Sequence, residues 1–271
     1  MENIEQQNME AFHKRLALVM QEIHSICEKN NIKYSMIGGT LLGAIRHKDF
    51  IPWDDDIDIA MPYHDYIKFK NIVFSMHHEW LEFNLAGKTP QYFIPFIKAY
   101  DSRTTLIEEY SENPKGIFID IFPLSYVGNS MKEALKEFKY HKFLSALLKR
   151  KGYRFSTGKI REFVFNVFAT AISQKILVNK IENHYESLNL KRKKYISDMD
   201  GSTKGIVPSD LFNDYILYNF GEYQFYRIKN ADEYLKLVFG DYMKLPPLEK
   251  QVPHHFAYLN LDLPYKDYVK K

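Results

Sequence analysis

Two acidic residues in an apolar setting, Asp56 and Asp58, place the strongest constraint on how this chain can fold. They stand in the string DDDIDIAMP, where acidic and aliphatic residues alternate with the period of two that a β-strand requires. A strand here would direct both carboxylates to one face, and Ile57 and Ile59 into a core on the other. Asp54 would share the acidic face if the strand began that early. Carboxylates about 5 Å apart repel each other by roughly 3 kcal/mol at an effective dielectric constant near 20.

A bound divalent cation would remove this repulsion. Mg²⁺ prefers hard oxygen ligands and is commonly held by one or two carboxylates together with substrate phosphates. The simpler alternative is a solvated acidic turn. Because the residues on the other face of the strand are apolar, we favour Asp56 and Asp58 as ligands of Mg²⁺ in phosphate chemistry.

A glycine-rich turn precedes the acidic strand. Residues 34–37 suit a short strand, and Gly38 and Gly39 permit the tight turn or the close ligand approach that would follow it. Thr40 is predicted to be the N-cap of a helix over residues 41–45. Because a helix N-terminus presents free backbone N–H groups and a positive dipole end, this turn suits phosphate.

A third acid, Asp120, lies within the otherwise apolar residues 117–122. A lone buried carboxylate costs several kcal/mol or becomes neutral, unless a metal or a charged partner satisfies it. Asp120 is therefore either a hydrogen-bonded structural residue or part of the metal site. Pro123 is predicted to end its strand.

Basic residues near these acids could neutralise a substrate phosphate. Arg46 would stand at the end of the helix that follows the glycine turn, where it either binds phosphate with its guanidinium fork or simply interacts with the helix dipole. Lys98 and Arg103 lie on or beside predicted strands, and surface salt bridges are the alternative for both.

Gly38-Gly39 followed by Asp56-x-Asp58 resembles the signature of the nucleotidyltransferase superfamily, in which a third acid comes later from another strand. The fuller string GGTLLGAIRH…FIPWDDDIDI resembles the LicD family, the bacterial phosphocholine transferases related to fukutin and fukutin-related protein. The match runs almost without a gap for about thirty residues. Elsewhere it is thinner and rests on three strings: IKAYDSRTTLIE, GIFIDIFPL and FGDYMKLPP.

The resemblance implies an α+β fold, with a nucleotidyltransferase-like mixed sheet flanked by helices and an added, mainly helical region. It implies that Asp120 is the third acid and has the role of a metal-proximal base. Lys98 and Arg103 match basic positions of the family and are expected to contact nucleotide phosphate or acceptor. Tyr242 stands in the string that resembles a family motif closing over the active site.

The activity that the resemblance implies is Mg²⁺-dependent transfer of phosphocholine from CDP-choline to a sugar hydroxyl, with release of CMP. The acceptor would be a lipid-linked glycan precursor of teichoic acid or lipopolysaccharide type. The residues leave other activities open: a different CDP-linked polyol or ethanolamine phosphate as donor, nucleotidyl transfer to a small molecule, or binding without catalysis. A choline ammonium prefers an aromatic cage, and the sequence does not select its members among Tyr63, Tyr92, Tyr100, Tyr110, Phe122 and Tyr242.

Three segments are predicted: a catalytic core (1–128), a helical insertion or second lobe (129–195) and a C-terminal segment closing over the active site (196–271). Helices are expected at 4–30, 65–76, 131–151, 163–181 and 231–239. Strands are expected at 80–85, 93–100, 104–108, 116–121 and 220–225, with a loop at 240–247.

Composition bears on the partners of the protein and on its cellular compartment. A net charge of +3 does not indicate a nucleic-acid binder. The single cysteine, Cys27, is expected to be buried and to fit a reducing compartment. With no signal peptide and uncharged runs of at most 12 residues, the protein is expected to be cytoplasmic. Basic runs at 149–154 and 191–194 stand at the ends of predicted helices. They are either part of an ordinary helical layer or hold the protein against the inner face of the plasma membrane.

Overall fold

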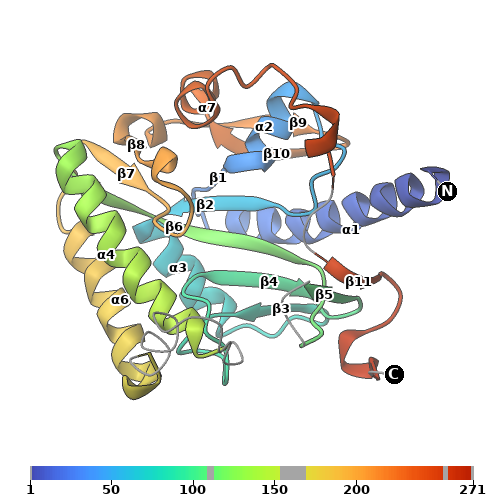
Figure 1. The fold of residues 1–271 in the computed structure, drawn as a ribbon, viewed down its shortest axis with the longest axis horizontal. Helices are drawn as coiled ribbons and strands as arrows, with labels where there is room; N and C mark the ends of the chain where they lie inside the picture. The colour runs from blue at the N-terminus through green and yellow to red at the C-terminus, as the bar shows by residue number, and fades with distance from the viewer. Residues whose placement is uncertain (1, 109–112, 153–168, 253–255, 270–271) are drawn as a thin grey trace.

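The fold is α+β and is built around one mixed β-sheet (Figure 1). The computed structural model describes residues 2–108, 113–152, 169–252 and 256–269. The prediction of a nucleotidyltransferase-like mixed sheet flanked by helices is confirmed.

The α-helices are α1 (Glu2–Lys29), α2 (Gly38–Arg46), α3 (Tyr63–Val73), α4 (Met131–Arg150), α6 (Gln174–Asn189) and α7 (Ala231–Phe239). The strands are β1 (Ser35–Met36), β2 (Asp58–Pro62), β3 (Leu81–Asn84), β4 (Ile97–Asp101), β5 (Thr105–Glu108), β6 (Phe118–Gly128), β7 (Tyr195–Ser197), β8 (Val207–Pro208), β9 (Tyr215–Phe220), β10 (Tyr223–Ile228) and β11 (Phe256–Asn260). Short 3-10 helices are η1 (Thr203–Gly205), η2 (Ser209–Phe212), η3 (Leu248–Lys250) and η4 (Tyr265–Asp267).

The central sheet has the strand order β1-β2-β6-β4-β3. Strand β6 is long enough to pair with β2 and β4 through its first half and with β7 through its second, and β8 then pairs with β7. Among these pairings, β2 with β6 is parallel and the others are antiparallel. Two further pairs lie outside this sheet: the hairpin β9–β10, and β11 with β5.

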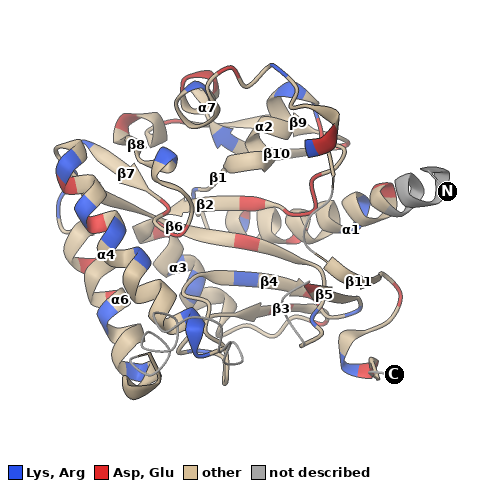
Figure 2. Ribbon diagram, viewed as in Figure 1, with Lys and Arg blue, Asp and Glu red and all other residues tan. Residues whose placement is uncertain are grey.

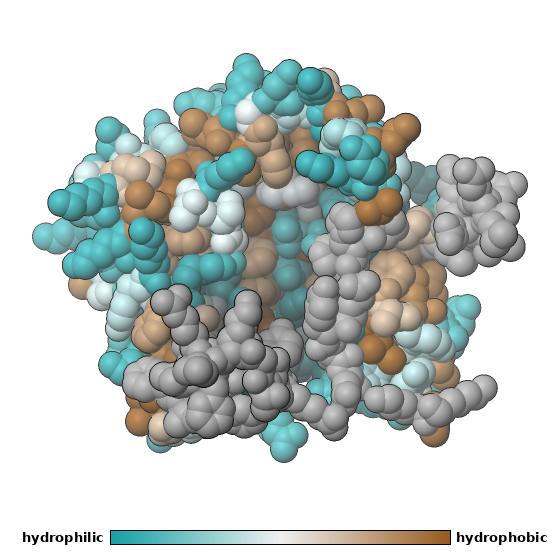
Figure 3. Space-filling model, viewed as in Figure 1, coloured by the Kyte–Doolittle hydropathy of each residue, from teal (hydrophilic) through white to brown (hydrophobic). Residues whose placement is uncertain are grey.

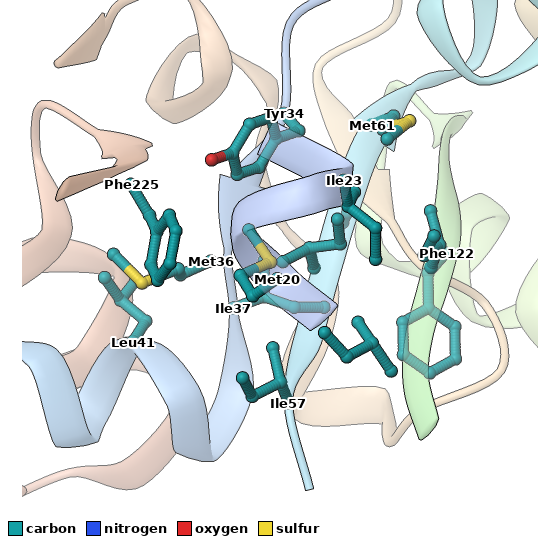
Figure 4. Packing of buried hydrophobic residues seen from close by; sticks show 14 of the residues in the cluster. Met20, Ile23, Tyr34, Met36, Ile37, Leu41, Ile57, Met61, Phe122 and Phe225 are labelled. Atoms are coloured by element: carbon teal, nitrogen blue, oxygen red, sulfur yellow. The ribbon is translucent and has the colours of Figure 1, made fainter. Parts of the chain in front are cut away.

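Helix α1 lies behind the sheet in the view of Figure 1 and supplies much of the main hydrophobic core. Met20 and Ile23 of α1 are fully buried, and in Figure 4 they lie among Met36, Ile57 and Phe225 from β1, the approach to β2 and β10. The expectation that Ile57 and its neighbour Ile59 point into the core is therefore confirmed. Cys27 is also buried in this core, and burial raises the pKa of its thiol, as suits a structural cysteine rather than a nucleophile.

Helices α4 and α6 enclose a second hydrophobic cluster at one side of the sheet. Ser130 caps α4 by accepting a hydrogen bond from the Glu133 N–H. Since β7 and β8, which follow α6, extend the central sheet, the helical region is attached to the core through β6. The C-terminal part also joins the main core through β10 and α7 and pairs with β5 through β11. The division of the chain into segments 1–128, 129–195 and 196–271 stays a prediction.

The prediction that Pro123 ends a strand is wrong, because β6 runs through it to Gly128. The Asp120 N–H donates to Ile57 O on the β2 side, so the alternate residues 121 and 123 direct their backbone nitrogens toward β4. Pairing with β4 stops at Ile121. The missing N–H of Pro123 therefore faces a position where no strand needs it.

Two other sequence boundaries are wrong. The helix expected at 163–181 falls partly outside the described residues, and within them it is interrupted at Ser173, which caps α6 by accepting from the Ile176 N–H. The single strand expected at 220–225 is interrupted by the turn at 221–222 that joins the end of β9 to the start of β10, where Gly221 has a positive φ of 54°. By contrast, the helix expected at 231–239 is α7 itself.

The position of β6 at the centre of the sheet generates a stability prediction. Replacing the fully buried Ile121 by Ala should lower the free energy of unfolding by about 2–5 kcal/mol, since a cavity remains in a packed core. Leu217→Ala on β9, where the side chain is 45% exposed, should change it by less than about 0.5 kcal/mol. Urea unfolding of both variants checks this, and equal losses would contradict the central role of β6.

Candidate active site

Two carboxylates from different parts of the chain stand side by side on the sheet. Because β2 and β6 pair in parallel, Asp58 lies directly opposite Asp120, and residues in register share a face. Figure 2 shows the acidic positions of β2 and β6 next to each other near the middle of the molecule. In the same view, Figure 3 shows that this face is hollowed near its centre. Asp56 precedes β2, and its charge acts on Asp58.

On the other side of β6, antiparallel pairing places Lys98 of β4 opposite Asp120. The Lys98 Nζ lies 3.2 Å from Asp120 Oδ1 and 3.9 Å from Glu108 Oε1, and it sits 3.4 Å from the centre of the Phe118 ring. The Lys98 side chain is only 9% exposed, so its charge is little screened by water. The row Asp58, Asp120, Lys98 therefore crosses three adjacent strands, and the cation offsets part of the negative charge.

The glycine turn lies beside this row. Gly38 has a φ of +54°, and a Cβ there would lie 3.3 Å from Asp58 Oδ2. A Cβ on Gly39 would come within 2.7 Å of Asp54 Oδ2. Helix α2 begins at this turn, so its unpaired first-turn N–H groups open next to the carboxylates. The predicted proximity of a phosphate-suited turn and the acidic residues is thus seen in the fold.

Thr40 does not cap α2 as the sequence suggested. The helix starts three residues earlier, its N-cap is Ile37 without a side-chain hydrogen bond, and Thr40 lies within the first turn. The Thr40 Oγ1 instead accepts a hydrogen bond from the Asp58 N–H at 2.8 Å. Glycine at position 38 allows this early start because it adopts the positive φ without strain. Thr40 thereby fixes the helix that begins at the glycine turn to the acidic strand.

The acids raise one another's proton affinity. Burial raises the pKa of the Asp58 carboxyl well above its usual range, and the negative charges of Asp56, Asp120, Asp54 and Asp198 raise it further. Burial also raises the pKa of Asp120, while the Lys98 ammonium opposes that shift. The buried Asp120 Oδ1 makes no hydrogen bond within the described part of the chain, since Lys98 approaches it as an ion pair without hydrogen-bond angles.

Further groups that were not predicted from the sequence lie near the site. Asp198, directly after β7, is near enough to Asp58 for its charge to raise the pKa of that carboxyl. Tyr234 of α7 is buried, and its hydroxyl oxygen accepts from the Gly38 N–H at 3.5 Å. The charge of Lys149 of α4 acts on Asp120. One signal was available, because Asp198-Met199-Asp200 repeats the Asp-x-Asp spacing of the first acidic pair.

Arg46 and Tyr242 meet each other rather than the acids. Arg46 ends α2, and its Nη1 donates to Tyr242 O at 2.8 Å. The Tyr242 hydroxyl donates to Asp232 Oδ1 at 2.7 Å. These contacts attach the predicted loop at 240–247 to the end of α2 that is opposite the glycine turn.

Arg103 lies on the other side of the sheet. Its guanidinium makes a two-pronged contact with Asp101, with nitrogen–oxygen distances of 2.8 and 2.7 Å, and lies 3.8 Å from the centre of the Trp80 ring. Asp101 also pairs with Arg15 of α1 at 3.5 Å, and α1 covers the face opposite the acids. The structure therefore does not bring Arg103 to the row of Asp58, Asp120 and Lys98.

Comparison with known proteins agrees with this geometry. The family model described as LicD/FKTN/FKRP, nucleotidyltransferase domain, matches residues 31–155. The lipopolysaccharide cholinephosphotransferase LicD of Haemophilus influenzae is 33% identical over 245 residues, covering 88% of this chain and 92% of that protein. The chain belongs to the LicD family. As a homologue of a cholinephosphotransferase, it is a transferase.

Other relatives match shorter pieces of the chain. The ribitol 5-phosphate transferase FKRP of human and mouse is 47% identical over 36 residues, which is 13% of this chain and 7% of FKRP. An uncharacterized protein of Rickettsia typhi is 49% identical over 55 residues, or 20% of this chain and 18% of that protein. Within the residues that the structure describes, no helix is both long and apolar enough to cross a bilayer.

The oxygen-rich site fits a cation that arrives with phosphate better than a preformed metal cage. Over the described ranges, no group of three or more His, Cys, Asp or Glu side chains is arranged to hold a metal ion. Mg²⁺, however, usually keeps several waters and takes only one or two protein carboxylates with substrate phosphates. Asp58 and Asp120, whose buried Oδ1 makes no hydrogen bond within the described residues, supply such hard oxygens beside a helix N-terminus suited to phosphate.

Crowding of the carboxylates generates a pH prediction. A carboxyl whose pKa is raised by folding destabilises the protein increasingly as the pH rises above its unfolded value of 3.8. In metal-free buffer, Asp58→Asn should therefore be more stable than wild type at pH 7, on the order of 1–3 kcal/mol, with the difference vanishing below about pH 4.

Urea unfolding between pH 3 and 8 measures this difference. Asp210→Asn, at an exposed position in η2, is the control and should follow wild type at every pH. A difference between Asp58→Asn and wild type that does not change with pH would contradict the electrostatic explanation.

Proposed function

We propose that this protein transfers phosphocholine from CDP-choline to a sugar hydroxyl of a cell-surface glycan precursor, of teichoic acid or lipopolysaccharide type, and releases CMP. The observation that carries the proposal is the register of β2 and β6, which sets Asp58 opposite Asp120 beside the N-terminus of α2. The similarity along most of the chain to a lipopolysaccharide cholinephosphotransferase supports it.

The glycine turn would bind the diphosphate of the donor. Gly38 and Gly39 leave room for a close approach, and the first-turn N–H groups of α2, including that of Thr40, suit negative oxygens. Asp56, Asp58 and Asp120 would hold Mg²⁺ against the phosphates, and the metal would supply Lewis-acid stabilisation of the charge that develops during transfer. The residues bind and orient the reactants, so most of the catalysis is positioning and charge neutralisation.

Lys98 has two roles in this proposal. Its ion pair keeps Asp120 charged and oriented, and its ammonium, 3.2 Å from that carboxylate, adds positive charge where the diphosphate would lie. Arg46 and Tyr242 would bind the distal part of the donor or acceptor, because their contacts link the C-terminal loop to α2. The position of Arg103 beside Asp101, on the face of α1, gives no support to a substrate contact from that residue.

Aromatic rings on the face of the acids support a choline-linked donor. Phe118 and Phe122 alternate with Asp120 on β6, so the three side chains share one face. Phe96 packs on Phe122 at 4.4 Å between ring centres, and the Tyr92 and Tyr100 hydroxyls are 3.0 Å apart. A quaternary ammonium is attracted to such ring faces.

The other aromatic residues considered from the sequence lie elsewhere: Tyr63 stacks on Tyr185, Tyr242 binds Asp232, and Tyr110 is outside the described residues. A ribitol phosphate donor is the second candidate, since the FKRP enzymes named for that activity share 47% identity with this chain over 36 residues. CDP-glycerol and CDP-ethanolamine remain further candidate donors.

A lipid-linked acceptor would place the protein in the cytoplasm, as a peripheral protein at the inner face of the plasma membrane. Lys191, Arg192, Lys193 and Lys194 give one basic surface segment. The second basic run, at 149–151, is partly buried, Lys149 in it pairs with Asp200, and its continuation at 153–154 lies outside the described residues. Such segments are attracted to anionic lipid by about 1 kcal/mol per basic residue. The proposal includes no nucleic-acid partner.

Turnover is the first test. Wild-type protein with CDP-choline, Mg²⁺ and a crude lipid-linked glycan fraction should release CMP, and Asp58→Asn should reduce the rate at least a hundredfold, because losing one metal carboxylate costs several kcal/mol of barrier. The exposed variant Asp210→Asn should keep wild-type turnover.

The product identifies the reaction class. CMP from CDP-ribitol but not from CDP-choline would change the donor and keep the mechanism. Pyrophosphate release from a nucleoside triphosphate would favour the nucleotidyltransferase alternative. Donor binding in the presence of Mg²⁺, without any turnover, would favour a non-catalytic binding protein.

Metal binding can be tested without turnover. Mg²⁺ together with CDP-choline, at about 100 times their apparent dissociation constant, should stabilise the wild-type fold by about 2.7 kcal/mol, and EDTA should remove this gain. Asp58→Asn should gain little. An equal gain in Asp58→Asn, or in EDTA, would show that the donor binds without the carboxylate–metal site.

A further inference from the structure

A second acidic turn, residues 198–201, follows β7 and lies near enough to the acidic strand β2 for its charge to act there. Strand β7 pairs with the second half of β6. The half-buried Asp198 carboxylate accepts a hydrogen bond from the Gly201 N–H at 2.7 Å. Its charge acts on Asp58 of β2 and on Tyr234 of α7, the residue whose hydroxyl accepts from the Gly38 N–H of the phosphate-suited turn. Asp198 therefore lies within electrostatic range of the acidic strand β2 and of the glycine turn.

The neighbouring Asp200 is held from several sides by α4. Its side chain is fully buried. Asp200 Oδ1 accepts from Ser145 Oγ at 2.7 Å and from Lys149 Nζ at 3.0 Å, and Oδ2 lies 2.9 Å from His141 Nε2. Lys142 Nζ donates to the Asp200 backbone oxygen at 2.6 Å. Four side chains of α4 thus bind the carboxylate and the backbone carbonyl of Asp200. These contacts fix the backbone that carries Asp198.

The residue between the two acids is strained. Met199 is fully buried and has a φ of +54°, a left-handed conformation that an unbranched non-glycine residue rarely adopts. Such a conformation persists only where the surroundings hold it, and it is found disproportionately at functional sites. The contacts of α4 with Asp200 provide that restraint.

The acids of the site differ in their cationic partners. Asp120 is paired with Lys98 at 3.2 Å, which stabilises its charged form and disfavours proton uptake. Asp200 is saturated by His141, Ser145 and Lys149. Asp58 stands against the glycine turn, where a donor's diphosphate would bind. Asp198 has no ammonium or guanidinium within ion-pair distance among the described residues.

We propose that Asp198 accepts the proton of the acceptor hydroxyl, and that Asp200 is a positioning residue that holds it there. This inference rests on the proposed phosphocholine transfer. The acceptor oxygen forms a bond to the β-phosphorus of the donor, and its proton passes to an Asp198 carboxylate oxygen. The bond from that phosphorus to the bridging oxygen breaks, and its electron pair leaves with CMP. No oxidant or further reactant is needed.

The charges around Asp198 agree with this role. Burial raises the pKa of its carboxyl to about 6, while the hydrogen bond from Gly201 opposes the shift. A proton acceptor works best when its pKa is near the working pH. The charged or titratable groups that act on it come from every neighbouring element: Asp58, Asp200, His141, Lys142, Tyr185 and Tyr234.

The first test compares wild type with Asp198→Asn, which keeps the shape of the side chain and removes its proton uptake. At saturating Mg²⁺ and CDP-choline, kcat for CMP release should fall by about 10²–10⁴-fold, while donor affinity measured by calorimetry stays within about threefold. The wild-type rate should rise with pH to a plateau above about pH 6, and this acid limb should be absent from the residual rate of Asp198→Asn.

Chemical rescue separates proton transfer from folding. Added formate or azide should raise the rate of Asp198→Gly at least tenfold over its rate without the anion, because a small anion can occupy the vacated position. Asp200→Asn should lower kcat about a hundredfold with little change in donor affinity, as expected for a misplaced reacting group. The exposed Asp210→Asn should behave as wild type in every measurement.

The outcomes separate this inference from the proposed function. If wild type turns over and Asp198→Asn keeps more than half of kcat or keeps the acid limb, the role of Asp198 is wrong and the transferase proposal stands. A loss of kcat in Asp198→Gly that no anion restores, with an unchanged melting temperature, also overturns the role. If wild type releases no CMP from any CDP-linked donor with acceptor present, both proposals fall together.

Discussion

The parallel pairing of β2 with β6 is the constraint on which the rest of the site depends. It puts Asp58 opposite Asp120 and so brings two negative charges together on a partly buried face. Two features of the fold offset the repulsion between these charges: Lys98 of the neighbouring strand β4 pairs with Asp120, and the N-terminus of α2 lies beside Asp58. Thr40 joins that helix to the acidic strand by a hydrogen bond to the Asp58 N–H. The geometry that crowds the acids also makes them competent to share a cation and a phosphate.

The later half of the chain completes the site instead of merely covering it. Strand β6 is long enough to pair with the acidic strand at one end and with β7 at the other, so the turn that carries Asp198 is registered against the same strand as Asp120. Helix α4 fixes this turn through Asp200, and α7 contributes Tyr234 at the glycine turn. A single long strand thus couples the nucleotidyltransferase-like core to the helical region. The similarity to LicD likewise extends beyond that core, over 88% of the chain.

Much of the site was predictable because its signals are local. Period-two alternation at Asp56 and Asp58, two glycines, and an acid within an apolar run each depend on a few neighbouring residues. The wrong predictions were those that depend on partners. Pro123 remains inside β6 because its nitrogen faces no strand, and Thr40 bonds to another strand instead of capping its own helix. Arg103 matches a basic position of the family string, but the alternation of β4 turns its partner Asp101 to the far face.

The acidic pair and the glycine turn could be predicted from the chain alone, because backbone periodicity and glycine conformation are properties of short segments. The fold class and the role of the third acid followed from the resemblance to the LicD family. Only the tertiary structure decided which charges meet. Lys98 reaches Asp120 through strand register, Arg46 binds a carbonyl 196 residues away, and Asp198 joins the centre through the far end of β6. Register depends on which strand faces are buried together, so the partner of each charged side chain follows from the assembled core.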